Sequence, residues 1–140
     1  MGTWGAGLLD SDSAQDFLDQ VNGIPVEARS TKVEQVLVRV AEDPSAVNRE
    51  FVPEEVVAAV AVVAVTAARS REFEWMNNET LIQVAGEMGP QDHLRDAAIS
   101  ALSAVAGSDD SPLLSGWKNE DDRRLMERQI DEIRSVLRDS

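Results

Sequence analysis

Apolar residues recur along the chain with the spacing that buries one face of a helix. After Ser30 they follow one another at intervals of three and four residues, at Val33, Val36, Leu37 and Val40. Residues three and four apart lie on the same side of an α-helix. No stretch alternates apolar and polar residues as a half-buried strand would. The pattern therefore predicts an all-α fold.

Capping and helix-breaking residues divide this pattern into about six predicted helices. The first is expected over residues 13–21, with Ser11 or Asp12 as its cap. The second is expected to begin at Ser30, with Glu34 near the position that a capping box uses. The other four are expected over residues 53–68, 77–88, 91–106 and 121–137.

The stretch 53–68 is predicted to be the central helix. Its start, Pro53-Glu54-Glu55, suits a first helical turn, where acidic side chains favour the positive end of the helix dipole. From Val56 to Ala68 every residue except Thr66 is alanine or valine. Valine also favours strands, but the length of the run and the interleaved alanines favour a helix. A helix without a polar face must be covered on all sides, and this one is shorter than the roughly 20 residues that span a membrane.

The expected architecture is a compact bundle of about six helices around this Ala/Val-rich helix, with residues 1–140 forming a single domain. Residues from the other helices are expected to complete the core. They are Phe17, Leu18, Val21, Leu94, Ala97, Ala98, Ala101, Leu102, Val105, Leu125, Ile130, Ile133 and Leu137.

Cysteine is absent from the sequence, which removes disulfides, thiolate zinc sites and cysteine nucleophiles from consideration. The N-terminus has neither the basic region nor the apolar stretch of a signal peptide. Both features lead us to expect a cytoplasmic protein.

The formal net charge is −13 at pH 7. This charge repels nucleic-acid phosphates and anionic lipid surfaces, so neither a nucleic acid nor a membrane is an expected partner. The acidic excess is spread along the chain rather than gathered in one dense stripe. A solvated acidic surface that binds another protein remains compatible with it.

The N-terminal motif resembles a bacterial family. Met1-Gly2-Thr3-Trp4-Gly5-Ala6-Gly7, followed by the segment from Leu9 to Phe17, is similar to the domain-of-unknown-function family numbered four-two-five-nine. Leu9 stands where members usually have Phe, and Ser11 where they usually have Asn. The Ala/Val-rich middle and the segment Ser111–Trp117 continue the resemblance more loosely. No activity, cofactor or site residue comes with it.

Four aspartates near the N-terminus form the first candidate site: Asp10, Asp12, Asp16 and Asp19. No basic residue precedes Arg29 to balance them. Helical spacing places the last three on one face. Three interpretations stay open, namely capping of the first helix with solvated carboxylates, a partner-binding patch, and an oxygen-rich site for Ca²⁺ or Mg²⁺. The spacing does not match a calcium-binding loop, because Ala14, Gln15 and Val21 occupy positions that need ligands or glycine.

The three tryptophans are the large amphipathic aromatic residues of the chain. Trp4, Trp75 and Trp117 either anchor chain segments to the helical core or present a partner with an exposed aromatic anchor. Trp4 and Trp75 are retained as partner-binding candidates. Trp75 is the less expected to be buried, since it lies in a polar stretch.

No residue set carries a catalytic signature. The single histidine, His93, is expected at the surface in the first turn of its helix, and no second nitrogen or sulfur ligand accompanies it. Neither a nucleophile motif nor a phosphate-binding loop is present. We therefore expect no catalytic residues, no metal ligands and no cofactor.

The sequence favours a small non-enzymatic acidic protein-binding module, which could act like an immunity protein or an inhibitor of a basic protein. The alternative is a divalent-metal-dependent or enzymatic domain that uses the N-terminal aspartates. The pattern does not define the oligomeric state.

Overall fold

The computed structural model describes residues 12–43, 46, 50, 51, 53–67, 79–88, 92–106 and 120–139. Within this part of the chain, the fold is formed by six α-helices, with the short 3-10 helix η3 before α5 and no strand, so the predicted all-α class is confirmed. The helices are α1 (Asp12–Asn22), α2 (Val26–Glu42), α3 (Pro53–Ala67), α4 (Glu79–Met88), η3 (Asp92–Leu94), α5 (Arg95–Ala106) and α6 (Glu120–Asp139).

Helix α1 begins one residue before its predicted start and ends one residue after its predicted end, at Asn22. The backbone N–H of Gly23 still donates to the Asp19 and Gln20 carbonyls, at 3.0 and 3.2 Å, so the helical pairing closes at this residue. The side chain of Asp12 and all of Ser11 lie outside the described residues. Their predicted capping role therefore stays a prediction.

The predicted start of the second helix at Ser30 was wrong. Helix α2 begins at Val26 with Pro25 as its N-cap, and Ser30 lies one turn inside. Pro25 has φ −56° and ψ 146° and makes no side-chain capping hydrogen bond, while the Ala28 N–H donates to the Pro25 carbonyl at 2.9 Å. Pro25 has the non-helical backbone conformation of an N-cap residue but no polar side chain, so the usual capping residue is missing where the helix begins.

Helix α3 is the central element, as the sequence predicts. All residues from Val56 to Ala64 are buried. The hydroxyl of Thr66, the polar residue of the run, donates a hydrogen bond to the Val63 carbonyl at 2.7 Å, so this polar group is paired within its own helix. None of the helices in the described part of the chain combines the length and apolar character needed to cross a membrane.

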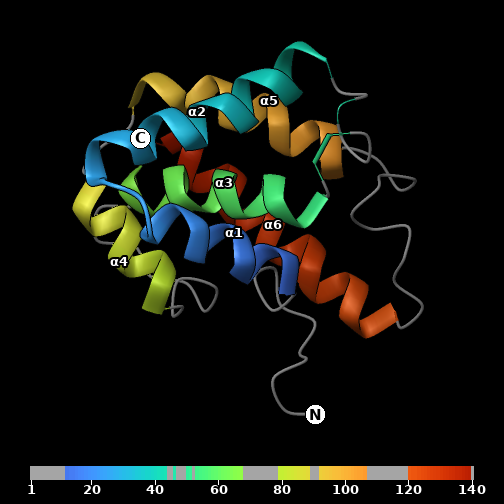
Figure 1. Ribbon diagram of the computed structural model, residues 1–140. Helices are drawn as coiled ribbons and strands as arrows, with labels where there is room; N and C mark the ends of the chain where they lie inside the picture. Colours follow the sequence, from blue (N-terminus) through green and yellow to red (C-terminus); the bar gives the residue numbers. More distant parts are fainter. Residues whose placement is uncertain are drawn as a thin grey trace.

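The other five helices surround α3, which contacts each of them. Figure 1 shows α3 in green in the middle, with α2 and α5 along one side and α1 along the opposite side. Helix α4 lies at one end of this arrangement, and α6 packs against α3 and α5. The buried side chains of all six helices form one contiguous core. The predicted bundle around a central buried helix is confirmed.

The core differs from the predicted set in a few positions. On α6, Val136 is buried although it was not predicted, and Leu125 is only half-buried. On α5, Ala97 is likewise half-buried. The predicted helix from residue 91 is divided into η3 and α5, so its first turn is 3-10 rather than α-helical. On α3, Val65 and Ala67 are half-buried, and the other predicted core residues of α1, α2, α5 and α6 are buried.

Arg29 joins three segments of the fold from a buried position on α2. Its guanidinium donates to the Asn22 carbonyl at 2.9 Å, to the Ile24 carbonyl at 3.2 Å and to the Glu87 carboxylate at 2.7 Å. The carbonyls belong to the end of α1 and the following turn, and Glu87 belongs to α4. A buried charge of this kind is stable because each contact is a charge-assisted hydrogen bond. The contacts fix α4 beside the junction of α1 and α2.

Candidate protein-binding surface

Two of the predicted aspartates lie on the outer side of α1. Asp16 and Asp19 are both exposed, while Ala14, Phe17, Leu18 and Val21 on the opposite side of the helix are buried. The helix therefore separates an apolar inner face from a carboxylate-bearing outer face, as its sequence spacing predicts.

Gln15 connects this outer face to α4. Its side-chain amide donates to the Asp19 carboxylate at 3.0 Å and to the Thr80 hydroxyl at 3.1 Å. The first of these bonds orients Asp19 along its own helix, and the second crosses to a residue 65 positions away in the chain. The exposed sides of α1 and α4 are thereby held next to each other.

The exposed side of α4 adds acidic and apolar character. Glu79, Gln83 and Glu87 are exposed, and Ile82 retains 52% of its accessible surface. Gly86 lies one turn after Ile82 and has nothing within 4 Å of where a Cβ would stand, so the surface beside Ile82 is open. We call the exposed sides of these two helices, with Asp16 and Asp19 on α1 and Glu79, Ile82, Gln83 and Glu87 on α4, the α1–α4 face.

The α1–α4 face is negative without local compensation from its own helices. Neither α1 nor α4 contains a lysine or arginine, whereas α2, α5 and α6 all do. Arg29 of α2 reaches Glu87, but its side chain is 93% buried and its charge is used in that pair. Exposed carboxylates without interspersed bases sum to a negative potential that extends about a Debye length into solvent, ~8 Å at physiological salt.

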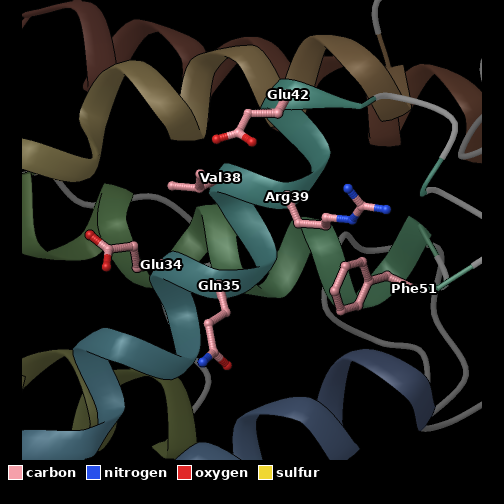
Figure 2. A pocket seen from close by; sticks show the side chains of 6 residues that line it. All are labelled: Glu34, Gln35, Val38, Arg39, Glu42 and Phe51. Atoms are coloured by element: carbon pink, nitrogen blue, oxygen red, sulfur yellow. The ribbon is translucent and has the colours of Figure 1, made fainter.

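A second surface feature lies on the exposed side of α2. A hollow of about 650 Å³ is lined by Glu34, Gln35, Val38, Arg39, Glu42 and Phe51. Figure 2 shows Glu34, Val38 and Glu42 following one side of the helix, with Arg39 and Phe51 on the other. Val38 is half-buried, and Phe51 packs against the core, so the lining combines charged ends with apolar surface.

Arg39 within the hollow is held by acidic neighbours. Its Nε lies 3.1 Å from both Glu50 carboxylate oxygens, its Nη2 lies 2.6 Å from Oε2, and Asp43 Oδ2 is 3.7 Å away. The hydrogen bonds and negative charge of Glu50 raise the pKa of Arg39 above its ordinary value. Because the pKa of Arg39 is higher in the folded than in the unfolded state, the ion pair contributes its full stabilisation at pH values below the unfolded-state pKa. This stabilisation is lost only as the pH rises through the folded-state pKa. Arg39 therefore stays charged at neutral pH.

The other sequence-predicted site residues are placed only in part. Asp10, Trp4 and Trp75 lie outside the described residues, and Asp12 is described as the first residue of α1 but not by its side chain. His93 is exposed, as predicted, with Nε2 4.0 Å from Glu34 Oε2. Within the described ranges, no group of three or more His, Asp and Glu side chains could hold a metal ion.

The sequence pattern pointed to the carboxylates of α1 as candidates but did not point to α4 beside them. The exposure of Ile82 could have been predicted from its position on the helix. Leu81, Val84 and Ala85 define the buried side of α4, and Ile82 falls outside it. An apolar residue out of phase with its helix is expected at the surface. The pairing of α4 with α1 depends on a contact distant in sequence, so no local pattern indicated it.

A family model described as "Domain of unknown function (DUF4259)" matches residues 2–128, a span that covers α1 to α5 and the first part of α6. No curated protein and no solved structure matches the chain.

Proposed function

The chain belongs to the DUF4259 family, and we propose that it is a small non-enzymatic protein-binding module whose α1–α4 face binds a basic protein. One observation carries this proposal. Two neighbouring helices expose carboxylates and contain no basic residue, and α4 also carries Ile82, an apolar residue that the fold leaves 52% exposed.

The chemistry of the α1–α4 face fits a protein partner with a positive surface. An interface commonly buries a few apolar anchors inside a polar rim, and Ile82 with Glu79 and Gln83 beside it has this composition. The carboxylates supply charge complementarity, which raises the association rate and rejects acidic partners. The contact between Gln15 and Thr80 holds both helices in place before binding, so little conformational entropy is lost when the complex forms.

An inhibitor of a basic toxin or enzyme is the class of module that this surface suits best. Such inhibitors gain association rate from opposite charge, and their affinity falls as salt screens the attraction. The lack of cysteine is compatible with action in the cytoplasm, where thiols stay reduced.

The proposal is tested by affinity capture from a lysate of the host at low and at moderate salt. The bait is the full chain, as wild type and as the Asp16→Asn/Asp19→Asn variant. The matched control is Asp96→Asn/Asp131→Asn, which removes the same charge from exposed positions on α5 and α6. We expect one discrete basic partner, retained by the wild type and the control, weakened by salt and lost in the α1 variant.

Two outcomes would contradict this proposal. Capture that is equal for all three baits, or that does not respond to salt, would exclude the α1–α4 face as the interface. A melting temperature that rises with millimolar Mg²⁺ or Ca²⁺ in the wild type, but not in the Asp16→Asn/Asp19→Asn variant, would instead support the metal-dependent alternative.

A further inference from the structure

We propose that the hollow on α2 is a binding site for a linear aliphatic diamine or polyamine, which lies along the helix with one ammonium group near Glu34 and another near Glu42. This site is separate from the α1–α4 face. The proposal therefore neither requires nor weakens the proposed protein-binding function.

The two carboxylates of the proposed site lie about two helical turns apart on α2. Glu34, Val38 and Glu42 are four residues apart in succession, and Figure 2 shows all three on the same side of α2. Eight residues of α-helix rise ~12 Å, so the backbone positions of the two glutamates are separated by about that distance. Both side chains are exposed and reach solvent at either end of the hollow.

The surface between the carboxylates is apolar. Val38 lies midway between them, while Phe51 lines the hollow on the other side of α2. A methylene chain would cover this surface, while an inorganic cation would leave it exposed to water. The hollow therefore favours an organic dication over Na⁺ or Mg²⁺.

The charge of the lining supports a cation rather than an anion. Arg39 is the basic residue of the lining, and its guanidinium is already bound by Glu50 and by Asp43. Glu34 and Glu42 thus leave the hollow with a negative excess. His93 near Glu34 is a further titratable group at this end, and its ring lies 4.0 Å from the carboxylate. An anionic ligand would meet four carboxylates for one guanidinium.

The volume of the hollow is also suited to a small molecule. Ligand sites in proteins commonly occupy roughly 300–1,000 Å³, and the hollow of about 650 Å³ falls within this range. Two ammonium groups on one chain gain affinity because binding of the first raises the effective concentration of the second. That gain depends on the chain length matching the separation of the carboxylates.

The test is a calorimetric titration of the full chain with α,ω-diamines of increasing length: butanediamine, octanediamine and dodecanediamine. We expect one site, with octanediamine bound about tenfold more tightly than butanediamine because only the longer chain reaches both carboxylates. We expect the Glu34→Gln/Glu42→Gln variant to lose about tenfold in affinity for octanediamine. The control variant Asp16→Asn/Asp19→Asn removes the same charge from α1 and should bind octanediamine as the wild type does.

Three results would overturn the proposal. Affinity that is the same for all chain lengths, or that falls equally in the α1 control, would show simple counterion attraction to an acidic protein. Affinity that survives Glu34→Gln/Glu42→Gln in a folded variant, as judged by its circular dichroism, would place the ligand elsewhere. A helical peptide with Lys, Leu and Lys at intervals of four residues that binds much more tightly than octanediamine would assign the hollow to a protein segment instead.

Discussion

At the scale of single residues, Arg29 shows how one buried charge determines the position of a surface. Its side chain is 7% exposed, and it binds two carbonyls at the α1–α2 junction together with the Glu87 carboxylate of α4. The two carbonyls would otherwise lack these partners, and α4 would lose a fixed contact with the junction. The α1–α4 face therefore depends on a residue that does not itself lie on that face.

We expect Arg29→Ala to lower the free energy of unfolding by ~2–4 kcal/mol, because it removes several charge-assisted hydrogen bonds from buried groups. Urea denaturation monitored by circular dichroism measures this loss. The control is Glu87→Gln, which keeps a hydrogen-bond acceptor at a side chain that is 45% exposed and should cost less than half as much. Equal stability of the Arg29→Ala variant and the wild type would contradict this account of the junction.

At the scale of elements, α3 limits how closely the other helices approach. Its alanines and valines are short, and α3 contacts each of the five other helices. Small side chains allow backbones to come close, and dense packing of this kind leaves no room for added volume. The composition of α3 therefore sets the spacing of the whole bundle.

We expect Ala61→Leu to lower the free energy of unfolding by ~1–3 kcal/mol, because Ala61 is fully buried in α3 and the added methylenes force its neighbours apart. The same change at Ala104 of α5, which is only half-buried, is the control and should cost less than half as much. Thermal unfolding of both variants measures the difference. Equal melting temperatures would mean that the interior around α3 is loosely packed.

Features of the fold that depend on residues close in sequence could be predicted, and those that depend on distant contacts could not. The helix α3 was predictable because its pattern is uniform over almost its whole length, and the exposure of Asp16 and Asp19 because it follows from spacing within one helix. The start of α2 was not, since Pro25 begins the helix without a polar cap and Ser30 offers a better local signal inside it. The α1–α4 face depends on Gln15 and Thr80, which are distant in sequence, so only the structure brings its two halves together.

At the scale of the whole molecule, charge opposes compactness. The net charge of −13 produces self-repulsion in the folded chain, and this repulsion weakens as salt screens it. The helical bundle tolerates the repulsion because its core is continuous across all six described helices. The acidic surface thus carries a stability cost that a basic partner would relieve on binding.

We expect the melting temperature to rise by ~3–6 °C between low and physiological ionic strength, which corresponds to about 1 kcal/mol for a domain of this size. Differential scanning calorimetry in NaCl measures the change. Sodium sulfate at matched ionic strength separates screening from preferential exclusion, which strengthens apolar burial. A melting temperature that falls with NaCl would mean that attractive ion pairs outweigh the repulsion.

Amide hydrogen exchange on the complex with the captured partner tests most directly whether the α1–α4 face is the binding surface. We expect the partner to slow exchange in α1 and α4 while leaving the exposed side of α2 and the outer side of α6 unchanged. The Asp16→Asn/Asp19→Asn variant should lose this protection at a partner concentration that saturates the wild type. Protection confined to other helices, or protection that the variant retains in full, would contradict the assignment of this face as the binding surface.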